Sequence, residues 1–170
     1  MEDFRTRLKS ETRKLHYQLE EQYPFKQLVE ATCDEKDLRN VVFCFFQKFD
    51  GLVAEKKNED KFYSEIGAIF ENFRDSHKES SQNLSHLDQL SLEYLLLGSR
   101  MGNTHILKKR PEIARLPNSQ YLKISFPSTI WKELLAKISN ISSTSEQEEF
   151  ISKVNSHYHD LISLGIEKRS

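Results

Sequence analysis

Glycine and proline are scarce in this 170-residue chain, with 5 and 4 residues, and cysteine occurs only twice. Strands are expected as runs of β-branched residues at a period of two, bounded by glycine or proline. The sequence contains no convincing run of this kind, whereas apolar residues recur at steps of three and four along most of its length. That spacing is typical of helices. We therefore predict an all-α fold, a compact bundle of about seven helices that forms one domain over residues 1–170.

Long apolar runs and an excess of one charge are also missing. The run from Val41 to Phe46 is far shorter than the ~20 residues of a membrane helix, and the first residues lack the apolar core of a signal peptide. Lys and Arg total 25 against 26 Asp and Glu, which argues against a general nucleic-acid binder. Cys33 and Cys44 are read as free thiols in a reducing compartment. We expect a cytoplasmic protein, a monomer or weak dimer, that binds neither nucleic acid nor membranes.

Local signals predict where the helices begin and end. Proline disfavours helix at the preceding residue, so the first helix should stop before Tyr23-Pro24. Thr32 or Asp34 is the expected N-cap of a long third helix, and Ser145 with Glu148 resembles a capping box. The expected helices are Asp3 to Gln22, Pro24 to Ala31, Asp34 to Asn58, Glu59 to His77, Ser85 to Lys109, Pro127 to Ile138 and Ser145 to Ile166, with a polar linker at Ser80 to Asn83.

A histidine, a carboxylate and a lysine share one side of the first predicted helix. Glu20 lies four residues after His16, so the two side chains lie on one face. A metal-bound imidazole usually has its second nitrogen held by a carboxylate, a carbonyl or water, although this spacing also fits an ordinary surface pair. Lys9 lies seven residues before His16, roughly 10 Å along the axis. That offset suits a planar ligand with a central metal and anionic groups at one edge. Alternatively, Lys9 is one of several exposed basic residues on this helix that form a solvated ridge.

Two glycines, Gly98 and Gly102, fall inside the helix predicted from Ser85 to Lys109. Each glycine in a helix interior costs about 1 kcal/mol relative to alanine. Because they are four residues apart, they should lie on one face, where the missing Cβ atoms let another group approach the backbone or let the helix bend. Close packing against a second helix explains this segment equally well.

These two segments together resemble the haem oxygenase family. Residues Leu8 to Glu20 (LKSETRKLHYQLE) are similar to the proximal helix of the family, and Tyr94 to Asn103 (YLLLGSRMGN) to its glycine-bearing distal helix. The distal segment is most similar to the bacterial, biliverdin-producing oxygenases found beside phytochromes. The order of the helices and the separation of the two motifs also fit, and the resemblance extends from Phe4 to Ile166.

The resemblance implies roles for several residues on the proximal side. In the family the proximal histidine ligates the haem iron, which corresponds to His16, and the carboxylate four residues later hydrogen-bonds its other nitrogen, which corresponds to Glu20. The lysine seven residues before the histidine pairs with a haem propionate, which corresponds to Lys9. We also expect Thr12 to contact the ligand, and Lys123, after the distal helix, to reach a propionate.

On the distal side the family glycines correspond to Gly98 and Gly102, and this chain departs from the family nearby. Asn103 stands where many members have a further glycine, and Ser99 where the mammalian type has an aspartate that organises distal water. One of these two side chains is expected to hold that water instead. Met101 lies between the glycines, where it either contacts the porphyrin ring or fills the core.

The activity implied by the resemblance is the cleavage of haem, which is both substrate and cofactor. O2 and external electrons convert it to biliverdin, CO and ferrous iron. The chain has no recognisable nucleotide-binding fingerprint, so the electrons are expected from a separate reductase or ferredoxin. The basic residues of the first helix are a candidate docking surface for an acidic donor.

Two other classes of function remain open at this point. A haem-binding or trafficking protein would have the same pocket but poor turnover, and Ser99 and Asn103 are the features that keep this alternative open. A helical relative with another small ligand is the third possibility, because a fold does not determine chemistry.

Overall fold

The computed structural model describes residues 2–74 and 84–169, and all the regular structure in these residues is helical. The predicted all-α class is therefore confirmed. There are more helices than the seven expected, because the region from residue 99 onward contains short separate ones. The α-helices are α1 (Phe4–Glu20), α2 (Phe25–Val29), α3 (Glu35–Lys56), α4 (Lys61–Phe70), α5 (His86–Gly98), α6 (Asn103–Lys109), α7 (Gln120–Lys123), α8 (Ser128–Ser139) and α9 (Thr144–Arg169), with 3-10 turns at Glu71–Phe73 and Pro111–Arg115.

The N-terminal helices follow their capping signals closely. The carboxylate of Asp3 accepts a hydrogen bond from the Arg5 backbone N–H at 3.1 Å and so caps α1. Asp34, rather than Thr32, caps α3 in a capping box with Asp37. α1 ends two residues earlier than predicted, at Glu20. The buried residues of α1 are spaced by four and seven positions and set which side of the helix faces the bundle: Phe4, Leu8, Thr12 and Leu19.

The prediction of a single helix from Ser85 to Lys109 is wrong, because this segment forms two helices. α5 ends at Gly98, residues 99–102 form turns, and α6 begins at Asn103. The Ser99 hydroxyl donates to the Leu96 carbonyl oxygen at 2.7 Å, satisfying a carbonyl in the last turn of α5. Gly98 is therefore the last residue of α5 and Gly102 lies in the turn, so neither glycine is in a helix interior as predicted.

Other expected boundaries move by a few residues. The capping box at Ser145 is wrong, because α9 already begins at Thr144 and Ser143 accepts from the Glu146 backbone N–H at 3.4 Å. The fourth helix is shorter than expected, since α4 ends at Phe70 and continues only as a 3-10 turn. The polar linker Ser80 to Asn83 and the expected end at His77 lie outside the described residues.

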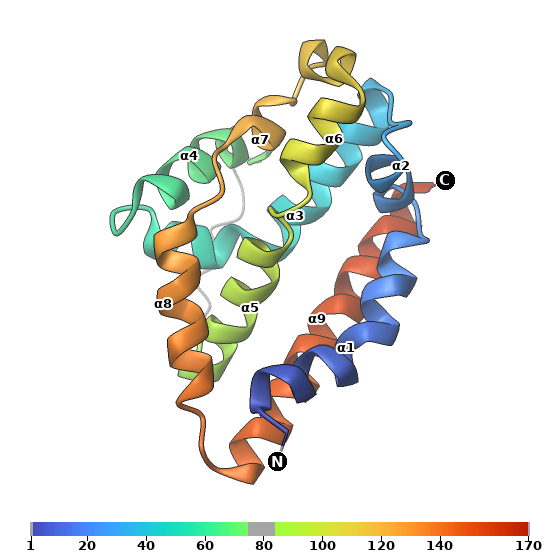
Figure 1. Ribbon diagram of the computed structural model, residues 1–170. Helices are drawn as coiled ribbons and strands as arrows, with labels where there is room; N and C mark the ends of the chain where they lie inside the picture. Colours follow the sequence, from blue (N-terminus) through green and yellow to red (C-terminus); the bar gives the residue numbers. More distant parts are fainter. Residues whose placement is uncertain (1, 75–83, 170) are drawn as a thin grey trace.

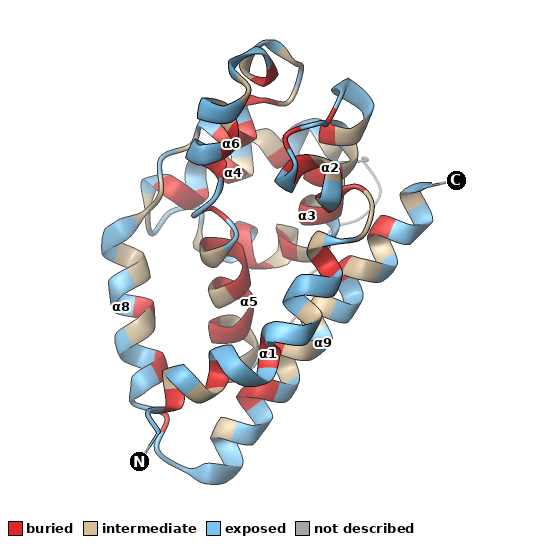
Figure 2. Ribbon diagram, turned by 45° about the vertical axis from the view of Figure 1, so that its right-hand side comes forward, coloured by how far each residue is buried: buried red, intermediate tan, exposed pale blue. Residues whose placement is uncertain are grey.

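α9 runs through the length of the bundle and packs against α1, α3 and α5. Figure 1 shows α1 and α9 side by side, with α5 and α8 forming the other part of the bundle. Figure 2 shows that α5 is largely buried, whereas α1 and α8 expose one side to solvent. No helix within the described ranges is both long enough and apolar enough to cross a membrane. This arrangement leaves a space between α1 and α5 whose lining is described below.

The contact between α5 and α9 contains a histidine that makes stability sensitive to acid. His157 Nε2 lies 2.9 Å from Ser91 Oγ. Burial, reinforced by the nearby Lys48 charge, lowers the pKa of His157 to about 4. The unfolded chain binds this proton near pH 6.5, so the folded state should lose stability as the pH falls from about 6.5 to 4.

We predict that His157→Gln flattens this part of the pH dependence. Glutamine can keep the hydrogen bond to Ser91 and carries no charge. Urea denaturation at pH 7.5, 6 and 5 measures the effect, with exposed His86→Gln as the control. A wild-type free energy of unfolding that is the same at pH 7.5 and 5 would contradict the prediction.

Candidate functional site

A cavity of about 590 Å³ lies where α1, α5, α8 and α9 come together, which is within the range of about 300–1,000 Å³ usual for small-molecule and cofactor sites. It is lined mainly by aliphatic and aromatic side chains, with basic side chains from one helix only. The lining residues are Arg5, Leu8, Lys9, Thr12, Arg13, His16, Tyr17, Leu19, Phe45, Tyr94, Leu95, Gly98, Ser99, Met101, Trp131, Leu135, Tyr158 and Leu161.

His16 lies on the α1 wall of this cavity with one ring nitrogen already engaged. Its Nε2 atom is 3.1 Å from Oε1 of Glu20. Glu20 is not itself a lining residue, so it acts on the cavity through the imidazole. A carboxylate in this position fixes the orientation of an imidazole and leaves the other ring nitrogen as an electron-pair donor.

Tyr158, from α9, supports the imidazole from a second direction, a contact that the sequence did not predict. The two rings are stacked with centroids 5.6 Å apart and an interplanar angle of 20°. Burial raises the pKa of the Tyr158 phenol well above its usual value, so this ring remains neutral. His16 is thus held between a carboxylate on its own helix and an aromatic ring on another.

We predict that Glu20→Gln weakens metal-centred binding at His16 without unfolding the chain. Loss of a partner that holds a ligating histidine typically costs about 10–100-fold in affinity, and Glu20 is partly exposed. A hemin titration followed by visible absorbance measures the change. Glu21→Gln is the matched control, because Glu21 is an exposed neighbour outside the cavity lining. Equal affinities for the two variants would contradict a supporting role for Glu20.

Three basic residues give the cavity a positive edge. Arg5, Lys9 and Arg13 all line it from α1, and none of the described lining residues is acidic. Arg7 lies on another side of the same helix, where it pairs with Glu11 at 2.7 Å. The basic residues of α1 are therefore divided between two faces and do not form the single ridge considered from the sequence. A ligand with negative groups along one edge matches this charge distribution.

The opposite part of the cavity is largely aromatic. Trp131 of α8 stacks on Tyr94 of α5 with centroids 5.9 Å apart, and Phe126 packs edge-on against Trp131. Burial raises the pKa of Tyr94, although the charge of Arg5 opposes the shift. Flat apolar surfaces of this kind favour a flat aromatic ligand. The sequence offered no signal for this contribution of α8, because it depends on how distant helices pack.

The glycine segment contributes one of its two glycines to the cavity. Gly98 lines it beside Ser99 and Met101. A Cβ atom on Gly98 would lie 3.6 Å from Trp131 Cη2, at ordinary contact distance. Neither Gly98 nor Gly102 has a positive φ angle, so the feature that matters at Gly98 is the missing side chain rather than a special backbone conformation.

Other residues predicted for the site lie elsewhere. Gly102 is exposed, Asn103 is buried and Lys123 is exposed, and none of them lines the cavity. The turn at 99–102 separates Gly102 and Asn103 from the wall that Gly98 forms. Thr12 does line the cavity, but its hydroxyl donates to the Leu8 carbonyl oxygen at 2.8 Å. Met101 is 56% exposed, which places it at the rim rather than in the core.

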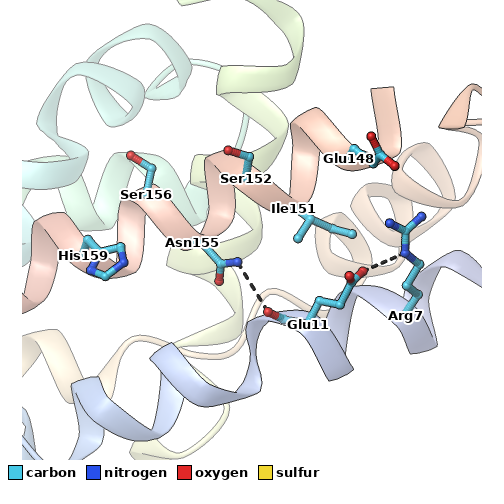
Figure 3. Close-up of a pocket in the computed structure, with 8 residues that line it drawn as sticks. All are labelled: Arg7, Glu11, Glu148, Ile151, Ser152, Asn155, Ser156 and His159. Atoms are coloured by element: carbon cyan, nitrogen blue, oxygen red, sulfur yellow. Dashed lines mark hydrogen bonds and ion pairs between the residues drawn. The ribbon is translucent and has the colours of Figure 1, made fainter. Parts of the chain in front are cut away.

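A second hollow of about 610 Å³ lies along the junction of α1 and α9 and is a shallow groove (Figure 3). Its walls are mostly polar side chains, and its dominant contact is the Arg7–Glu11 ion pair. Asn155 Nδ2 donates to the Glu11 carbonyl oxygen at 3.4 Å across the groove. The groove lacks the aromatic walls and the supported imidazole of the first cavity, which we take as the candidate site.

Within the described ranges, no group of three or more His, Cys, Asp and Glu side chains is placed to hold a metal ion. The chain matches no protein-family model. It also matches no curated protein.

Proposed function

We propose that this protein is a haem oxygenase, which uses O2 and external electrons to convert haem to biliverdin, CO and ferrous iron. The observation that supports it best is the cavity itself. A carboxylate-supported imidazole on α1 and a wall without a side chain at Gly98 line the same aromatic space. These are the two segments on which the sequence resemblance depends, and they come from helices far apart in the chain.

The donor set of the cavity fits haem. The free ring nitrogen of His16 is a suitable axial ligand for iron. Lys9, with Arg5 and Arg13 beside it, would neutralise the two propionates. Trp131, Phe45 and Leu135 would cover the faces of the macrocycle, for which the cavity provides apolar walls. When bound there, haem would supply the iron at which O2 is activated.

The residues of this chain would then control water and protons around the distal face. Gly98 leaves room close to the backbone, and the described lining includes no carboxylic acid. Protons would therefore be delivered on this side by a hydroxyl, backbone groups and water rather than by a carboxylic acid. The Ser99 hydroxyl donates a hydrogen bond to the Leu96 carbonyl oxygen, so the hydroxyl oxygen can accept a hydrogen bond from water. Ser99 is therefore our candidate for holding the distal water, in preference to Asn103.

Electrons would come from a separate protein such as a reductase or ferredoxin. Lys14 and Arg13 are exposed on α1 beside the cavity, and an acidic donor docked there would approach the haem edge. The cytoplasm is the proposed location, because both cysteines are buried as free thiols.

A haem-binding or trafficking protein is the second candidate. It is favoured by the position of Asn103, which is buried away from the cavity, so that Ser99 is the one polar side chain that the turn after α5 contributes to the described lining. If this one side chain of the turn held water too weakly, proton delivery to the distal side would be slow and the haem complex would persist without turnover.

One experiment separates these functions. The purified protein is mixed with hemin, the Soret band is followed to saturation, and a reductant is then added under air. A Soret band that gives way to biliverdin absorbance supports the oxygenase, and a stable Soret band supports the trafficking protein. The absence of a saturable Soret band would overturn both.

A further inference from the structure

Arg100 is buried directly behind the glycine wall of the cavity, where a charged side chain is costly. It is 2% exposed and lies between Ser99 and Met101, which both line the cavity. Arginine is almost never fully buried unless it is paired. No carboxylate of the described residues forms an ion pair with it, and its Nε and Nη1 atoms have no hydrogen-bond partner. Its burial therefore calls for another explanation.

The guanidinium of Arg100 connects the turn after α5 to α7 and to the residue that follows α7. Nη2 donates to the backbone carbonyl oxygens of Tyr121 and Ile124, the latter at 3.2 Å. The guanidinium carbon also lies 4.4 Å from the centroid of the Tyr121 ring, close enough for a cation–π interaction. A single side chain thus binds two backbone groups and one ring across a gap of more than twenty residues.

Tyr121 continues this connection to another wall of the cavity. It is fully buried, and its ring stacks on Phe45 of α3 with centroids 5.5 Å apart. Phe45 lines the cavity. Arg100 is therefore joined to the site in two ways, through its own chain neighbours on the glycine wall and through Tyr121 to Phe45.

We propose that Arg100 is a positioning residue, which holds the Gly98–Met101 wall at its working distance from the ligand and from His16. As a role in catalysis this rests on the proposed haem oxygenase function. The placement of the wall, however, can be tested without any ligand. A turn that follows one glycine, Gly98, and contains another, Gly102, has little stiffness of its own, so a buried cation with two carbonyl acceptors supplies the restraint.

The chain carries its own reporter for this wall. Trp131 is the only tryptophan, and a Cβ placed on Gly98 would contact its ring. Arg100→Met should shift the Trp131 emission to longer wavelength and increase quenching by acrylamide. Arg110→Met is the matched control, because Arg110 also donates to a backbone carbonyl, that of Ala31 at 2.7 Å, but lies outside the cavity lining. It should leave both signals unchanged.

The haem complex provides the functional half of the test. Arg100→Met should keep the Soret band, since His16 lies on a different helix, but lose about 100-fold in turnover, a loss that a 1 Å misplacement can produce. Arg100→Lys should recover part of that loss, because its ammonium group can reach the same carbonyl oxygens. If Arg100→Met does not fold, the Lys variant is compared with Arg110→Lys in the same way.

The outcomes separate this proposal from the proposed function. Wild-type Trp131 emission and quenching in the Arg100 variants would overturn the positioning role, whether or not haem binds. Equal changes in the Arg100 and Arg110 variants would overturn it as well, because they would indicate general destabilisation. A wild-type protein without a Soret band overturns the haem oxygenase function alone, and the tryptophan signals then decide whether Arg100 fixes the wall.

Discussion

Replacing His16 with alanine should remove tight haem binding while leaving the fold intact. The loss should exceed about 100-fold in affinity, since removal of a mere supporting partner already costs up to that amount. The His16 side chain is half exposed, and substitutions at such positions usually change the free energy of unfolding by no more than about 0.5 kcal/mol. Hemin titrations followed at the Soret band, with thermal denaturation of the ligand-free protein, measure the two effects separately.

Two further measurements make this prediction specific to His16. His105→Ala serves as the matched control, because His105 is an exposed helical histidine that does not line the cavity. Added imidazole should restore part of the spectrum of the His16→Ala protein, since the substitution leaves space beside Tyr158 for a free ligand. Identical Soret spectra for wild type and His16→Ala would show that another group binds the iron, or that binding is nonspecific.

The α1 side of the site could be predicted because it is local. Lys9, Thr12 and His16 fall on one face by helical spacing alone, and the structure brings all three to the cavity. The cap of α3 was also predictable as one of two candidates, Thr32 or Asp34, because it joins a side chain to a backbone N–H three residues away. Helical spacing and capping involve residues at most four positions apart, so the sequence alone can predict them.

The remainder of the site could not be predicted because it depends on tertiary packing. Trp131 and Tyr158 reach the cavity from α8 and α9, and nothing in their neighbouring residues distinguishes them from core aromatics. The break after Gly98 was missed for a related reason. Apolar periodicity favours one helix through residue 109, whereas the observed turn is accompanied by contacts of Arg100 with Tyr121 and Ile124 that have no local signal.

Gly98→Leu is expected to abolish ligand binding in the cavity, whereas Gly98→Ala should be tolerated. A single Cβ at this position would lie 3.6 Å from Trp131 Cη2, which is ordinary contact. Alanine in place of glycine should even stabilise the end of α5 by about 0.4–1 kcal/mol, because the backbone conformation needs no positive φ. Leucine adds three more carbon atoms on the wall of the cavity, where they compete with the ligand for space.

Gly102→Leu provides the comparison that decides whether the effect comes from the cavity. No atom lies within 4 Å of a Cβ built on Gly102, and that residue is outside the cavity lining. The two leucine variants therefore place the same side chain four residues apart, one at the end of α5 inside the site and one in the following turn outside it. Hemin titrations should show a Soret band for wild type, Gly98→Ala and Gly102→Leu, and none for Gly98→Leu. The reverse order for the two leucine variants would mean that Gly102, rather than Gly98, faces the ligand, and that the interrupted helix is continuous when the ligand is bound.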